Sequence, residues 1–148
     1  MLISKKSRYA LKAVFELAKR KGEGPVKIAD IAKPQAIPQR FLEAILVQLK
    51  QAGLVESRRG SEGGYMLARD PETLTVGDVL RVVQGLPEPV ECVGKPDANC
   101  PMSMSCVFIP MWEKMMNAIT DVYDSTNFKD LLAEDLRKCK KASSDYVI

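Results

Sequence analysis

Residues 54–67 constrain the fold of this chain more than any other stretch, because the periodicity of the sequence changes there. Upstream of Leu54, apolar residues recur at helical spacing. From Leu54 a short run with strand character leads into a glycine-rich stretch at 60–64, and a second short strand follows at 65–67. The pattern therefore predicts helices that pack beside one small antiparallel hairpin.

Three helices are predicted before the hairpin, over residues 4–21, 26–33 and 38–52. Pro38 suits the first turn of the third helix, where its missing N–H is not needed. The apolar stripe of this helix, which is expected to face a core, comprises Phe41, Leu42, Ile45, Leu46 and Leu49. A short turn joins the second and third helices, as in a helix-turn-helix. Residues 1–70 are therefore predicted to form a winged helix-turn-helix.

Residues 71–106 are predicted to be a linker helix followed by a long loop. Thr75 can cap a helix over residues 76–84. The loop at 85–105 is rich in proline and carries cysteines. Because structureless loops of this length are uncommon in a compact domain unless they are functional, the loop is a candidate site.

Residues 107–148 are predicted to form a dimerisation helix and a C-terminal tail. The helix over 107–124 is apolar on more than one face, so in so small a chain its second face is expected to contact another subunit. A short last helix over 128–136 is expected to precede a polar tail. The predicted fold class is mainly α with a small β-hairpin wing, in a homodimer.

The charge distribution favours a nucleic-acid partner. Residues 1–69 hold 14 Lys and Arg against 6 Asp and Glu, a net charge of +8, whereas residues 70–148 carry a net charge of −5. A basic half suits a polyanion, since phosphate contacts release condensed counterions. A solvated basic surface remains the alternative on charge alone.

Other classes of protein are disfavoured by the sequence. No apolar run approaches the roughly 20 residues that span a bilayer, and no secretory signal is apparent, so we expect a cytoplasmic protein without a membrane partner. The chain contains no histidine, which removes Ser-His-Asp and Cys-His catalysis. No phosphate-binding loop or nucleophile–base pair is present either, so the chain is not expected to be an enzyme.

Base reading is expected from the wing and the third helix. The wing tip can enter the minor groove, whose negative potential favours arginine. The polar residues near the start of the third helix can meet base edges in the major groove. The wing candidates are Arg58, Arg59 and Gly60, and the helix candidates are Gln39 for adenine, Arg40 for guanine and Glu43 for cytosine.

Phosphate contacts are expected from four further residues of the basic half. They are Ser4, Lys5, Tyr9 and Lys27.

Three cysteines, Cys92, Cys100 and Cys106, lie in a C-x7-C-x5-C pattern just before the long helix. Three thiolates on one loop suit a soft metal centre, above all an iron–sulfur cluster. Disulfides fit poorly with a reducing cytosol, and structural zinc would need a fourth ligand. Buried free thiols or a redox switch remain open alternatives.

Nearly the whole chain resembles the Rrf-type family of bacterial iron–sulfur regulators, which includes IscR, NsrR and RirA. The resemblance is carried by the helix at 28–32, the wing and the cysteine loop, with the motifs Phe41-Leu42-Glu43, Gly53-Leu54-Val55, Arg59-Gly60 and Gly63-Gly64-Tyr65. It implies a homodimer on double-stranded promoter DNA, with DNA reading by Glu43 and Arg59. It also implies a [4Fe-4S] or [2Fe-2S] cluster on the three cysteines.

The chain departs from its relatives at the fourth cluster ligand. IscR-like members carry a histidine three residues after the third cysteine, where this chain has Ile109. NsrR-like members recruit an acidic residue from the partner's first helix, where this chain has Ser7-Arg8. The remaining candidates are Glu91, Asp97, Cys139, or an exogenous thiol or water.

The resemblance implies a transcription regulator, with repression as the expected outcome, that senses iron, nitric oxide or redox state through the cluster. One alternative is a winged-helix regulator that senses oxidants or zinc through its thiols without a cluster. Another is an interaction module that binds a protein partner and no DNA. Target promoters, signal, cluster type and the DNA-binding form stay open at this level.

Overall fold

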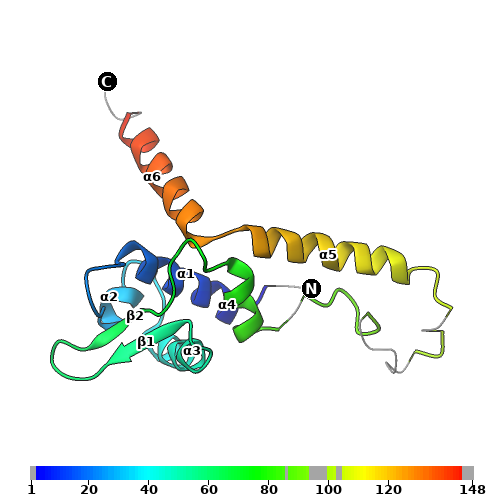
Figure 1. Ribbon diagram of the computed structural model, residues 1–148, viewed down its shortest axis with the longest axis horizontal. Coiled ribbons are helices and arrows are strands. Elements are labelled where there is room, and N and C mark those ends of the chain that lie inside the picture. The colour runs from blue at the N-terminus through cyan, green and yellow to red at the C-terminus, as the bar shows by residue number, and fades with distance from the viewer. Residues whose placement is uncertain (1–2, 86, 94–99, 103–104, 145–148) are drawn as a thin grey trace.

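The fold is mainly helical with one two-stranded hairpin, as the sequence predicts (Figure 1). The computed structural model describes residues 3–85, 87–93, 100–102 and 105–144. Its elements are α1 Lys5–Lys19, α2 Ile28–Ala32, α3 Gln39–Gln51, β1 Val55–Arg58, β2 Gly64–Leu67, α4 Val76–Val83, α5 Ile109–Ser125 and α6 Phe128–Ser144. Apart from the end of α6, the predicted bounds differ from these by at most two residues, which is ordinary fraying at element ends.

The core lies between α1 and α3. The apolar residues of α1 recur at helical spacing and are buried, and so are four members of the predicted α3 stripe. The buried set comprises Ala10, Ala13, Val14, Leu17, Leu42, Ile45, Leu46 and Leu49. The fifth member, Phe41, is wrongly predicted, because its side chain is 58% exposed. Its ring is tilted against the ring of Tyr9, with centroids 6.4 Å apart, whereas the adjacent Leu42 is fully buried.

Backbone hydrogen bonds join the hairpin to the segment before α2. β1 and β2 pair antiparallel from Val55 opposite Leu67 to Arg58 opposite Gly64. Val26 adds a third short partner, since its N–H and C=O exchange hydrogen bonds of 2.8 Å with Tyr65. The wing is therefore held at a fixed position relative to the helix-turn-helix unit.

Helix α4 packs against α1, α3 and the end of α5. Thr75 begins it with a capping box, in which its hydroxyl accepts from Asp78 N–H and its own N–H donates to the Asp78 carboxylate. Arg81 pairs with Asp124 of α5 at 2.6 Å, and this hydrogen bond lowers the pKa of Asp124 and raises that of Arg81. Gly77 lies against Asp124, where a Cβ would collide with the carboxylate.

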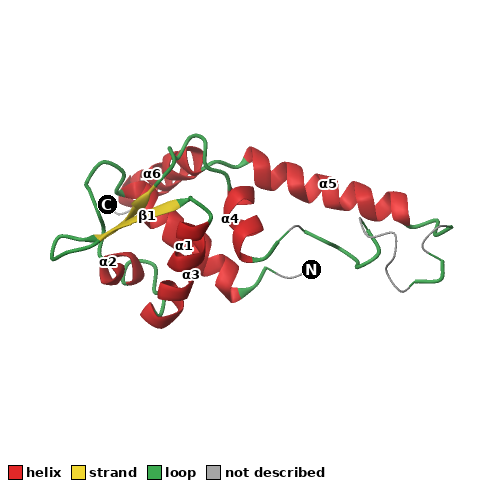
Figure 2. Ribbon diagram, turned by 60° about the horizontal axis from the view of Figure 1, so that its bottom comes forward, coloured by secondary structure: helices red, strands yellow, loops and turns green. Residues whose placement is uncertain are grey.

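Helix α5 projects from the body formed by α1–α4 and the hairpin (Figures 1 and 2). None of its residues is buried within the chain, although its sequence is rich in large apolar side chains. Met111, Met115 and Val122 are all exposed on it, and Val107 and Phe108 are exposed just before it. An apolar helix left open in a single chain is a candidate interface.

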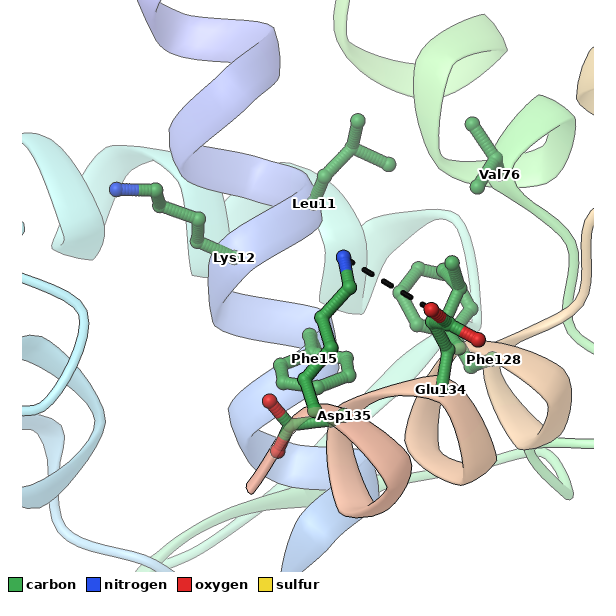
Figure 3. A pocket seen from close by; sticks show the side chains of 9 residues that line it. Leu11, Lys12, Phe15, Val76, Phe128, Glu134 and Asp135 are labelled. Atoms are coloured by element: carbon green, nitrogen blue, oxygen red, sulfur yellow. Dashed lines mark ion pairs between the residues drawn. The ribbon is translucent and has the colours of Figure 1, made fainter. Parts of the chain in front are cut away.

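Helix α6 is longer than predicted, because it continues to Ser144 instead of ending near Leu136. The apolar spacing stops at Leu136, but Glu134 forms ion pairs with Arg137 and Lys138, and good helix formers follow. The first turns of α6 pack on α1 through Phe128, which is buried. Leu11 and Phe15 on α1, Val76 on α4 and Phe128 surround an apolar hollow between these helices (Figure 3).

Among the residues that the structure describes, no helix is long and apolar enough to cross a lipid bilayer.

Candidate DNA-binding surface and sensor cysteines

One groove gathers five of the ten residues predicted to contact DNA. It lies between α3, the start of α2 and the hairpin, and it is lined by Lys27, Glu43, Arg58, Arg59 and Gly60. These residues come from three separate stretches of the chain, so the fold and not the sequence brings them together. We call the groove lined by these residues the wing groove.

The wing groove carries unbalanced positive charge. Arg58 and Arg59 are exposed, and within the described ranges neither forms an ion pair. Gly60 turns the tip with φ 112, a conformation that favours glycine, and its carbonyl accepts from Gly63 N–H at 3.0 Å. The two guanidinium groups are therefore available to an anionic partner.

The close approach of the wing to the backbone of Val26 requires a glycine at position 64. A Cβ on this residue would collide with the backbone carbonyl of Val26, the residue that pairs with Tyr65. We expect Gly64→Ala to push the wing away and to destabilise the fold by about 1–3 kcal/mol, the usual range for an overpacked site. Thermal or denaturant unfolding measures this loss.

The control for Gly64→Ala is Ser61→Ala, an exposed position at the same tip. Unfolding of Gly64→Ala at the wild-type midpoint, with unchanged DNA affinity, would contradict the role of Gly64 in wing packing.

The other five candidates lie at two helix starts. Gln39 and Arg40 are exposed in the first turn of α3. Ser4 is the N-cap of α1, where its hydroxyl accepts from Ser7 N–H at 3.0 Å, and the exposed Lys5 follows it. Tyr9, one turn further along α1, is half-buried against the core.

Sequence reasoning missed Ser57 and Ser61, which also line the wing groove. The tip position of Ser61 beside Gly60 was a usable signal. Nothing in the sequence marks Ser57, whose hydroxyl accepts from Lys50 Nζ of α3 at 2.5 Å and so ties β1 to that helix.

The three cysteines that we call the sensor cysteines, Cys92, Cys100 and Cys106, lie outside any helix or strand. Cys92 and Cys106 are half-buried, and Cys100 is exposed. In the part of the chain that the structure describes, no three Cys, Asp or Glu side chains are close enough to share a metal ion. The thiolate donors suit an iron–sulfur cluster chemically, but their arrangement in this single chain does not form a ready site.

The candidates for a fourth ligand are also dispersed. Cys139 is exposed on α6, a different element from the sensor cysteines, and Glu91 is exposed beside Cys92. Asp97 lies outside the described residues. The structure therefore brings together the predicted wing residues but not the predicted cluster ligands.

A model of the Rrf2 family, described as an iron-dependent transcriptional regulator, matches residues 3–134. The transcriptional regulator CymR of Bacillus subtilis is 38% identical over 131 residues, which is 88% of this chain and 89% of that protein. The transcriptional regulator IscR of Vibrio vulnificus is 33% identical over 135 residues, covering 91% of this chain and 79% of that protein.

Solved structures of an IscR and of a CymR are also similar to this chain. IscR of T. potens superposes with a TM-score of 0.75 at 36% identity, covering 91% of this chain and 88% of that one. CymR of B. subtilis, described as a global cysteine regulator, superposes with a TM-score of 0.74 at 36% identity, covering 90% of this chain and 98% of that one. The predicted fold class is confirmed by these superpositions.

Proposed function

The chain belongs to the Rrf2 family of transcriptional regulators, and from this premise we propose that it binds promoter DNA in the cytoplasm as a homodimer under the control of its sensor cysteines. The family and its relatives are DNA-binding regulators and not enzymes, as the sequence predicts. The finer parts of the proposal are the DNA-reading residues, the homodimer and the means of control.

The observation that carries the DNA-reading proposal is the wing groove. It combines Glu43 of α3 with Arg58 and Arg59 of the hairpin on one exposed surface. In winged helix-turn-helix binding the second helix of the unit reads the major groove while the wing reaches the neighbouring minor groove. A carboxylate on the reading helix selects cytosine amino groups, and arginine follows the minor-groove potential.

Arg59→Ala and Glu43→Ala test this proposal together. We define the operator as the DNA duplex that wild-type protein selects from a random pool. Arg59→Ala should weaken operator binding by about 1–3 kcal/mol, or roughly 5- to 150-fold. Glu43→Ala should instead broaden the sequence preference at one or two base pairs, because removal of a carboxylate removes discrimination. Fluorescence anisotropy at one fixed salt concentration measures both effects.

The matched controls are Arg137→Ala and Glu134→Ala on α6, which remove the same charges far along the chain from the wing groove. Wild-type operator affinity in Arg59→Ala, or unchanged selectivity in Glu43→Ala, would contradict the assignment of α3 and the wing.

The homodimer is supported by helix α5. Met111, Met115, Ala118 and Val122 follow one another at spacings of four, three and four residues, the repeat of a helix that packs on another helix. Met115, Ala118 and Val122, with Ile3, line an apolar hollow along this face. We propose that a second copy of the chain covers it, helix against helix.

For the control of DNA binding we propose that the sensor cysteines together hold an iron–sulfur cluster. The support is the donor chemistry, with three soft thiolates and no histidine in the chain, and membership of a family described as iron-dependent. When bound, such a cluster would supply a redox-sensitive centre on the segment that connects α4 to α5.

A second means of control is thiol chemistry without a cluster. The exposure of the thiols favours it, since Cys100 is exposed and Cys92 and Cys106 are half-buried, and partly exposed free thiols can react with oxidants. The similarity to CymR, whose structure is described as that of a global cysteine regulator, also favours it. Visible absorption of anaerobically purified protein separates the two, because free thiols and zinc thiolates are colourless.

A further inference from the structure

A set of hydrogen bonds joins the end of α4 to the start of α1. The Oε1 of Gln84, the C-cap residue of α4, accepts from Ser4 N–H at 3.2 Å and from the Ser7 hydroxyl at 2.7 Å. Ser7 is 0% exposed, and its hydroxyl also lies 2.8 Å from the Ser4 hydroxyl, so loss of Gln84 would leave this buried group with fewer hydrogen bonds at a cost in desolvation free energy. The link is therefore specific, because one amide oxygen satisfies two groups of a helix start far away in the sequence.

Gln84 also lies at the start of the segment that connects α4 to α5 and carries the sensor cysteines. The N–H groups of Gln84 and Gly85 both donate to Leu80 C=O, at 2.8 and 3.2 Å, and Gly85 ends the helix with φ 92. Further along, Pro87 and Val93 are buried, and Val93 adjoins Cys92. A change at Cys92 therefore acts on a stretch that follows the end of α4 and that is anchored in the protein by two buried residues, Pro87 and Val93.

Hydrogen bonds also join α1 to the turn before α3, the helix proposed to read the major groove. Glu16 of α1 is only 3% exposed, and its Oε2 accepts from Gln35 Nε2 at 3.0 Å. Gln35 lies in the turn between α2 and α3, and its carbonyl accepts from Lys12 Nζ of α1 at 3.3 Å. A shift of α1 along its axis would therefore move the turn that positions α3.

We propose that Gln84 is the positioning residue that couples the state of the sensor cysteines to the start of α1 and, through α1, to α3. The inference rests on the proposed control of DNA binding by the sensor cysteines. By linkage, the coupling is reciprocal: if the state of Cys92 changes operator affinity, operator binding must change the state of Cys92. This reciprocity supplies a readout that a merely structural role for Gln84 would leave unchanged.

The test measures how fast N-ethylmaleimide alkylates Cys92 in anaerobically purified full-length protein, with and without the operator. Mass spectrometry resolves each cysteine, and the exposed Cys139 on α6 is an internal reference. In wild type we expect the operator to change the Cys92 rate by about 5-fold or more, the lower end of ordinary allosteric coupling. Gln84→Ala and Ser7→Ala should lose this change.

Gln84→Glu should restore the change, because it keeps an acceptor oxygen for Ser4 and Ser7. Ser125→Ala is the matched control for Ser7→Ala, since among the described residues its hydroxyl donates to Val122 C=O within α5, and it should behave as wild type. Thermal unfolding of each variant identifies any loss of fold.

The outcomes separate this inference from the proposed function. An unchanged operator effect in a folded Gln84→Ala protein would overturn the role of Gln84 and leave control by the cysteines standing. A folded Gln84→Glu protein that fails to restore the effect would also overturn it. Wild-type protein that binds the operator with no change at Cys92, and whose affinity is indifferent to alkylation, would overturn the proposed control and the coupling with it.

Discussion

Val122→Asp should convert the dimer into a monomer and lower operator affinity by roughly 10²- to 10⁴-fold, the usual gain from linking two binding modules. Val122 is 61% exposed in the single chain and lies on the apolar face of α5. In the proposed dimer a carboxylate there would be buried against apolar side chains without a partner, which is strongly unfavourable. Because each half of a two-fold operator is read by one subunit, loss of the dimer removes the second contact.

Analytical ultracentrifugation and operator titration of Val122→Asp measure both effects. Asn117→Asp is the matched control, because it adds the same charge at an exposed position of α5 outside the apolar hollow. Asn117→Asp should remain dimeric and bind as wild type does. A Val122→Asp protein that stays dimeric at wild-type affinity would exclude this face of α5 as the interface.

Under the cluster proposal, alanine at any one of the sensor cysteines should abolish the control of DNA binding. If the cluster proposal is right, Cys92→Ala, Cys100→Ala and Cys106→Ala should each lose bound iron and visible absorption, because three ligands are already fewer than the four that a cluster usually has. Cys139→Ala should keep both, since Cys139 lies exposed on α6.

Iron and sulfide analysis, with absorption spectra, of the four anaerobically purified variants measures this prediction. Loss of iron in Cys139→Ala would make Cys139 a ligand and would contradict its assignment. Colourless wild-type protein whose DNA binding still depends on Cys92, Cys100 or Cys106 would replace the cluster with thiol chemistry. If DNA binding in all three sensor variants is regulated as in the wild-type protein, both the cluster and the thiol proposals are contradicted.

Most of the fold could be predicted from the sequence because local signals agreed with tertiary packing. The change of periodicity at Leu54 located the hairpin, and Thr75 located the start of α4. The end of α6 was missed because its last turns are polar, so no apolar spacing marks a helix there. Phe41 differs from the prediction because helical spacing does not reveal that it lies at the margin of the apolar stripe, where it is 58% exposed although the adjacent Leu42 is buried.

The candidate site was only partly predictable. The wing residues were found because charge and glycine pattern both pointed to the hairpin, and the fold gathers them with Glu43 in one groove. The link from Gln84 to Ser4 and Ser7 joins residues about 80 positions apart, and neither residue type is unusual where it stands. Only packing of α4 on α1 reveals such a contact.

Control of DNA binding by the sensor cysteines is expressed in one quantity, the dissociation constant for the operator as a function of the chemical state of residues 92, 100 and 106. It is measured most directly on a single anaerobic preparation of Cys139→Ala protein, titrated at fixed salt before oxygen exposure, after it, and after anaerobic restoration with reductant, iron and sulfide. We predict a shift of about 5-fold or more on exposure that is reversed on restoration. The same dissociation constant in all three titrations, in protein that still needs Arg59 to bind, would contradict the account.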